Sequence, residues 1–149
     1  MRTVAGVITI ERVVSTDRPV DAVFRYLADF TTTTEWDPGT VRTVRLDGDG
    51  GPGTTYRNTS RFGGKETELT YRVRELVPNE RLVLDGENST VAATDTMTFR
   101  VVPSGTEVTY RAEFRLKGVA ALAGPLLKGR FAKLGDEAER GMRESLARL

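Results

Sequence analysis

The sequence predicts an α+β fold: a curved antiparallel sheet of about seven strands wraps around one long C-terminal helix, and two short helices follow the first strand. Three observations support this prediction. Residues 41–117 contain alternating segments separated by turn residues, which is typical of antiparallel strands. Residues 125–149 change to a helical apolar period. A sheet with one solvent-exposed face must bury the other face, and only this helix is large enough to cover it.

Composition narrows the class of protein. The 149 residues suggest one domain, residues 1–149, which at this size buries roughly 68–70% of its unfolded surface. The 22 Lys and Arg residues nearly balance the 21 Asp and Glu residues, so we expect no nucleic-acid partner. The absence of cysteine and histidine excludes disulfides, Cys/His zinc sites and histidine general bases, and we expect no metal or cofactor. No apolar run reaches about 18 residues, so we expect a cytoplasmic protein without membrane insertion.

The first 29 residues predict one strand and one helix. Residues 4–14 alternate as a strand does, and residues 15–29 follow with an amphipathic pattern. Pro19 fits the first turn of this helix, because amide hydrogens in that turn have no partner within the helix. The candidate capping residues are Ser15, Thr16 and Asp17, and the apolar stripe is Val20, Val23, Phe24 and Leu27.

The stretch "DFTTTTEWDPG", residues 29–39, contains the only tryptophan of the chain. Thr32 followed by Glu35 matches a capping box, which predicts a very short second helix that the next Asp-Pro pair ends. We expect Trp36 at the corner between the first helix and the sheet, with the threonines as caps and on the solvent side. There Trp36 can act as a structural wedge, line the mouth of a cavity, or do both.

Six strands are expected after this corner, at residues 41–46, 54–62, 65–77, 82–87, 91–102 and 106–117. Gly63-Gly64 predicts a two-residue hairpin turn between two of them. In the last strand, alternate residues from Val108 to Leu116 are apolar or aromatic and those between are mostly charged, so one face is buried. The C-terminal helix carries an apolar stripe of Leu127, Phe131, Leu134, Ala138, Met142, Ser145 and Leu149, flanked by Leu126 and Leu146.

With Tyr110 taken as inward, the inward-facing positions of the sheet, Val101 among them, combine apolar and polar side chains. Unsatisfied buried polar groups cost roughly 1–3 kcal/mol each, so these groups meet a ligand or water, or else pair with one another. Apolar walls with a few polar groups are the usual composition of a ligand pocket, which favours a cavity. The predicted pocket residues are Trp36, Tyr56, Asn58, Ser60, Tyr71, Leu82, Asp95, Met97, Phe99, Tyr110, Phe114, Leu127 and Phe131.

Several phrases, taken together and in order, resemble a known family. They are "VFRYLADF", "WDPG", "VPNERL" and "SGTEVTY". The chain is similar to the polyketide cyclase/dehydrase and lipid-transport group of the START-like (SRPBCC) superfamily. The resemblance implies a helix-grip architecture, in which a curved sheet holds the C-terminal helix over a deep hydrophobic cavity.

The resemblance leaves the activity open, because members include aromatase/cyclases and steroid- or lipid-binding proteins. Cyclase members are described with Arg, Tyr, Ser and sometimes His in the pocket. This chain offers Tyr and Ser there but no His, and the arginines of the strands concerned fall on the outward parity: Arg57, Arg61, Arg72, Arg74 and Arg111.

Three functions are therefore considered. The first is binding of a small hydrophobic or amphipathic partner, such as a lipid, sterol-like or polyketide molecule, in an internal cavity. The second is a polyketide aromatase/cyclase or dehydratase that uses pocket Tyr and Asp groups for proton transfer. The third is a protein-interaction module whose apolar groove takes a partner's helix.

Overall fold

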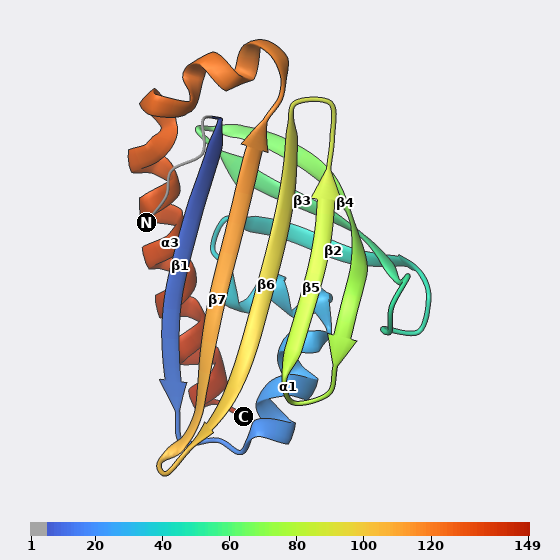
Figure 1. Cartoon of the computed structure of the whole chain (residues 1–149), viewed down its shortest axis with the longest axis vertical. Helices are drawn as coiled ribbons and strands as arrows, with labels where there is room; N and C mark the ends of the chain where they lie inside the picture. Colours follow the sequence, from blue (N-terminus) through green and yellow to red (C-terminus); the bar gives the residue numbers. More distant parts are fainter. Residues whose placement is uncertain (1–5) are drawn as a thin grey trace.

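The computed structural model describes residues 6–149, which form a helix-grip fold. Figure 1 shows the long helix α3 running beside a curved antiparallel sheet. The strands are β1 (Val7–Thr16), β2 (Thr40–Asp47), β3 (Thr55–Phe62), β4 (Lys65–Val77), β5 (Arg81–Glu87), β6 (Val91–Val102) and β7 (Gly105–Leu116). The helices are α1 (Val20–Ala28), η1 (Phe30–Thr32), α2 (Thr33–Trp36), η2 (Gly118–Ala123) and α3 (Gly124–Ala147).

Strands β2 to β7 pair as a meander in sequence order, and β1 pairs with β7 at one edge of the sheet. Its order is β1-β7-β6-β5-β4-β3-β2, so β1 and β2 form the two edges. The sequence prediction of seven antiparallel strands is confirmed. The hairpin between β3 and β4 is confirmed as well, because Phe62 pairs with Lys65 and both intervening glycines have positive φ, 60° and 83°.

Two close approaches hold α3 against the rest of the fold. A Cβ at Gly135 would lie 2.5 Å from the side chain of Ile10 on β1. A Cβ at Gly141 would overlap the carbonyl oxygen of Trp36 at the end of α2. Both positions need glycine because the helix backbone touches its neighbours there. Arg12 adds an ion pair to Asp136 of α3, with 2.9 Å between Nη2 and Oδ1.

The hydrophobic core consists of two clusters. The larger one surrounds α1 and α2 and includes Leu27, Trp36 and Met142. The smaller one lies under the first turns of α3, where Phe131 packs on Ile8 and Ile10. In Figure 1, α1 lies at the lower end of the sheet and η2 forms the orange bend at the upper end.

Several local predictions about the first helices are wrong. Pro19 is the N-cap of α1 and not part of its first turn, and no side chain caps that helix. The capping box at Thr32 does not form, because the Thr32 hydroxyl donates backward to the carbonyl oxygens of Tyr26 and Asp29. Glu35 instead accepts a hydrogen bond from the Tyr26 hydroxyl.

Burial corrects further expectations. Thr32 and Thr33 are buried and not on the solvent side, since Thr33 bonds the Phe30 carbonyl oxygen and Thr43. Val101 is 70% exposed, because this end of β6 extends beyond the core toward the turn into β7. Leu149, at the end of the predicted apolar stripe, and Leu126, which was expected to flank it, are exposed too. The predicted start of the first strand at Val4 lies outside the described residues.

Candidate functional site

A cavity of about 540 Å³ lies between the sheet and α3. Its sheet side comes from β1, β3, β4, β6 and β7, with one residue of β2, and its other walls come from η1, α2, η2 and α3. The volume lies within the usual range for small-molecule pockets, about 300–1,000 Å³. Both core clusters contribute to the walls, so the cavity occupies the space between them.

The cavity has an accessible end and a buried end. At the accessible end, Arg61, Lys65 and Thr90 line the cavity and are also exposed. These residues belong to the β3–β4 hairpin and the β5–β6 turn, on the side where η2 lies. At the buried end stands Trp36, which is 1% exposed. Trp36 therefore lies at the inner end of the cavity, which agrees with the alternative of a structural wedge and not with the alternative that it lines the mouth.

The structure brings nine of the thirteen predicted pocket residues together around this cavity. They are Trp36, Asn58, Ser60, Tyr71, Asp95, Tyr110, Phe114, Leu127 and Phe131. Parity along the strands predicted the sheet residues among them correctly as inward-facing. Their contact with a ligand stays a prediction.

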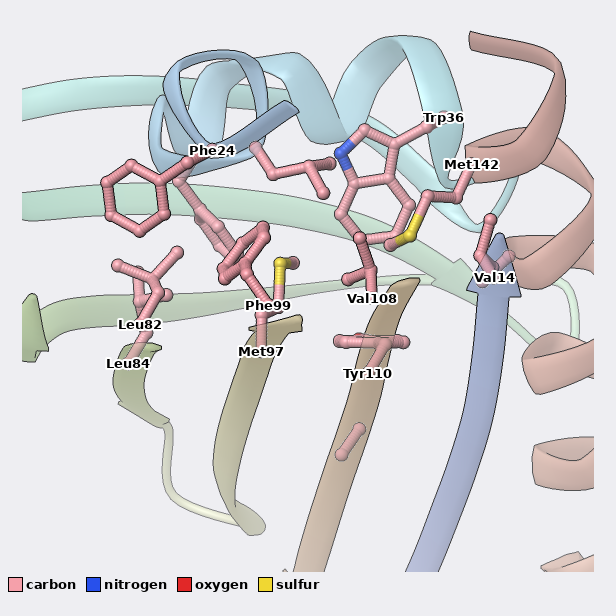
Figure 2. Close-up of a cluster of buried hydrophobic side chains, with 14 of the residues drawn as sticks. Val14, Phe24, Trp36, Leu82, Leu84, Met97, Phe99, Val108, Tyr110 and Met142 are labelled. Atoms are coloured by element: carbon pink, nitrogen blue, oxygen red, sulfur yellow. The ribbon is translucent and has the colours of Figure 1, made fainter. Parts of the chain in front are cut away.

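The other four lie in the core away from this cavity: Tyr56, Leu82, Met97 and Phe99. They are inward-facing, but α1 and η1 cover their part of the sheet. The ring of Phe24 packs edge-on against Phe99 at 5.0 Å between centroids, and Phe30 lies 5.7 Å from Tyr56. Figure 2 shows this filled part of the core, with Phe24, Phe99, Leu82 and Met97 grouped together.

One group of polar side chains in the wall is satisfied internally. Asn58 donates to Thr43 at 2.8 Å and accepts from Ser60 at 2.6 Å. Thr43 in turn bonds Thr33, and Thr40 donates to the carboxylate of Asp37. For these residues, the explanation that buried polar groups pair with one another is sufficient.

A second group is not satisfied internally. The Tyr110 hydroxyl donates to Asp95 Oδ2 at 2.8 Å, but Asp95 Oδ1 is buried without a partner among residues 6–149. Tyr71 also lines the cavity, and its hydroxyl has no hydrogen bond to any described residue. The Trp36 Nε1 atom is buried and unpaired within the described chain as well. In Figure 2 that nitrogen lies on the edge of the indole turned away from Tyr110.

Burial shifts the titration of these groups. It raises the pKa of Asp95 to about 7, with smaller contributions from the charges of Asp37 and Asp85, while the Tyr110 hydrogen bond opposes the shift. Burial also raises the pKa of Tyr71 and of Tyr110 well above its ordinary value, and the Asp95 charge adds to both shifts. Near neutral pH the cavity therefore holds two neutral phenols and one carboxyl group that is close to its titration midpoint.

Several residues that line the cavity were not among the pocket residues predicted from the sequence. The sequence predicts Asp37 only as the residue that ends the short helix, yet it lines the cavity, and burial raises its pKa. Its oxygens accept from the Gly39 amide and the Thr40 hydroxyl, at 3.1 and 3.0 Å. The Asp-x-Gly-Thr spacing was the available signal, because an aspartate often bonds the backbone two residues ahead. Ile10, Leu134 and Gly135 were also missed as wall residues.

The arrangement of residues 6–149 also bears on other kinds of site. No group of three or more Asp or Glu side chains there is placed to hold a metal ion. No helix in the same range combines the length and hydropathy that crossing a membrane requires.

The comparisons with known proteins agree with the fold. The profile of the family described as polyketide cyclase/dehydrase and lipid transport matches residues 7–149. No curated protein matches the sequence significantly.

Three solved structures illustrate the likeness. The Zhui aromatase/cyclase from Streptomyces sp. R1128 aligns with TM-score 0.81 and 16% identity, over 95% of this chain and 94% of that one. A protein from Thermus thermophilus aligns with TM-score 0.77 and 16% identity, over 94% and 96%. The di-domain aromatase/cyclase BexL of the BE-7585A biosynthetic pathway aligns with TM-score 0.72 and 14% identity, over 94% of this chain and 50% of that one. At these identities the likeness establishes the fold alone.

Proposed function

The chain belongs to the polyketide cyclase/dehydrase and lipid transport family, and from this premise we propose that it binds one small hydrophobic or amphipathic molecule between the sheet and α3. The observation that carries the proposal is the cavity of about 540 Å³. A packed core of this size leaves few voids larger than a water molecule, so a cavity this large calls for an occupant.

The outer half of the cavity suits an apolar body. Phe131 of α3 packs between Phe62 and Phe114 with tilted rings, whose centroids lie 4.8 and 4.7 Å away. All three rings line the cavity. Burial of apolar area at about 25 cal/mol per Å² would supply most of the affinity. The unpaired polar groups at the inner end would orient the ligand.

Binding is tested by titration with N-phenyl-1-naphthylamine, a neutral probe whose fluorescence rises in apolar surroundings. We expect saturable binding with one site per chain. The variant Ala138→Phe extends a ring from the wall into the cavity and should weaken binding of the probe about tenfold or more. The matched control Leu122→Gln changes a residue of η2 that is 82% exposed, and it should bind as the unchanged protein does. Equal binding by all three proteins would place the probe outside the cavity and contradict the proposal.

A second candidate function is cyclase or dehydratase activity on a polyketide. Asp95, next to the Tyr110 hydroxyl and with a pKa of about 7, favours it, because such a group can accept or donate a proton near neutral pH. The test is incubation with a poly-β-ketone thioester at a concentration that displaces the fluorescent probe. Cyclised or dehydrated product that is lost in Tyr110→Phe would support catalysis. Displacement of the probe without any product would reject it.

A further inference from the structure

Asp95 differs from Thr33, Thr40 and Asn58, the buried residues of the cavity wall whose polar side chains are hydrogen-bonded to other parts of the chain. It is 4% exposed, and one of its two carboxyl oxygens has no partner among residues 6–149. Asn58, at a similar 5% exposure, has its amide nitrogen and oxygen both bonded. A buried polar atom left unsatisfied costs roughly 1–3 kcal/mol, so Oδ1 of Asp95 would gain from a hydrogen bond to a ligand, as would Nε1 of Trp36.

Neighbouring residues fix how Asp95 presents that atom. Tyr110, on the adjacent strand β7, donates to Oδ2 at 2.8 Å, which leaves Oδ1 as the unpaired oxygen of a residue that lines the cavity. Trp36 packs edge-on against the Tyr110 ring, with centroids 5.5 Å apart and planes at 82°, and so restrains the hydroxyl. Figure 2 shows the Tyr110 ring below Trp36. The carboxyl group is therefore preorganised.

We propose that Asp95 is the specificity site of the cavity, and that it recognises an oxygen substituent, carbonyl or hydroxyl, on a ligand with a polycyclic or otherwise apolar body. This inference rests on the proposed function, because it assumes that an apolar ligand occupies the cavity. It adds the chemical class of the group at the ligand's inner end and names the atom that contacts it.

The protonation state of Asp95 decides which oxygen substituent fits. In the neutral carboxyl group the proton lies on Oδ1, since Oδ2 already accepts from Tyr110, and Oδ1 can donate to a ligand carbonyl. In the carboxylate, Oδ1 only accepts, so it repels a carbonyl oxygen but takes the proton of a hydroxyl group. A hydroxyl ligand can therefore pair with both states, whereas a ketone pairs with the neutral state alone.

The surrounding charges keep both states accessible. The titratable groups that act on Asp95 are Tyr110 on β7, Tyr71 on β4, Asp37 after α2 and Asp85 on β5. None of them is a cation, so none favours the carboxylate by its charge. The cavity-facing residues of α3, from Leu127 to Ala138, carry no charge. The cations of the wall, Arg61 and Lys65, lie at the accessible end.

The test compares three probes with one carbon skeleton: fluorene, 9-fluorenone and 9-fluorenol. Fluorene has no oxygen, so its affinity reports on the cavity alone. We expect the ratio of fluorenone affinity to fluorene affinity to fall about tenfold from about pH 5.5 to about pH 8.5, as Asp95 ionises. The ratio of fluorenol to fluorene should not fall over the same range.

Two variants identify the group responsible. Asp95→Asn cannot ionise, so its fluorenone-to-fluorene ratio should be the same at both pH values. Ser60→Ala removes another polar wall residue, one bonded only to Asn58, and it should keep the pH dependence of the unchanged protein. Carbon-13 NMR of the Asp95 carboxyl carbon gives an independent readout. By linkage, saturating fluorenone should raise the observed pKa of Asp95 by about one unit, and fluorene should not.

The outcomes separate the inference from its premise. Failure of fluorene to bind would overturn the proposed function and the inference together. Fluorene binding with a fluorenone ratio independent of pH would overturn the inference alone. A pH dependence that persists in Asp95→Asn would also overturn it, because another group would then be responsible.

Discussion

Asp95 connects the stability of the fold to pH. Its pKa is about 7 in the folded protein against 3.8 for the free side chain, so folding favours the neutral form. The stabilisation is fully present below about pH 4 and is lost as the pH rises through 7, with a size of about 4 kcal/mol. Urea unfolding of the unchanged protein and of Asp95→Asn, at several pH values, measures it. We expect their difference in unfolding free energy to shift by about this amount in favour of the variant, and parallel curves would contradict the assignment.

At the scale of single residues, the sequence predicted which way side chains point better than what they touch. Alternation along β7 placed Tyr110 inward, and the matching parity of β6 placed Asp95 on the same buried face. Phe99 has the same parity as Asp95, yet α1 covers it. Parity is a property of one strand, whereas contact depends on a helix that crosses the strand, and local sequence does not encode that crossing.

The packing of α2 against α3 depends on one glycine. A Cβ at Gly141 would overlap the Trp36 carbonyl oxygen, so Gly141→Ala must displace backbone. We expect it to lower the unfolding free energy by about 1–3 kcal/mol. Gly129→Ala in the same helix is the matched control, because no heavy atom lies within 4 Å of a Cβ there. It should stabilise the protein by about 1 kcal/mol. Thermal unfolding measures the change in stability of both variants. Equal changes would contradict the close approach of Gly141 to the Trp36 carbonyl oxygen.

At the scale of elements, bounds that rest on periodicity were predicted well, and ends that rest on capping were not. The predicted strand 91–102 and the predicted strand 65–77 match β6 and β4. The end of η1 and the start of α2 follow each other directly, so the Thr32 side chain has no free amides to cap and turns back to earlier carbonyl oxygens. A capping box presumes an isolated helix start, which this segment does not contain.

At the scale of the whole molecule, the order of elements predicted the sheet around α3, but not how the space between them divides. Length and order give one concave face and one covering helix. They do not say that α1 and η1 fill one half of that face and leave the other half open. For this reason, the predicted pocket included residues from both halves, and the mouth of the cavity was one of the positions considered for Trp36.

Filling the cavity with a side chain should raise the stability of the free protein and at the same time weaken the binding of a ligand. In the protein without ligand, Ala138→Phe buries new apolar area in empty space, so it should raise the unfolding free energy by about 1 kcal/mol. That gain corresponds to about 2–4 °C in Tm for a chain of this size. N-phenyl-1-naphthylamine at tenfold its Kd should raise the Tm of the unchanged protein by a similar amount, through about 1.4 kcal/mol of binding linkage. It should leave the Tm of Ala138→Phe nearly unchanged, because the ring occupies the ligand's volume. Scanning fluorimetry of both proteins, with and without the probe, measures all four values. If the variant melts lower without ligand and still gains from the probe, the ring has not entered the cavity, and α3 has moved to admit both.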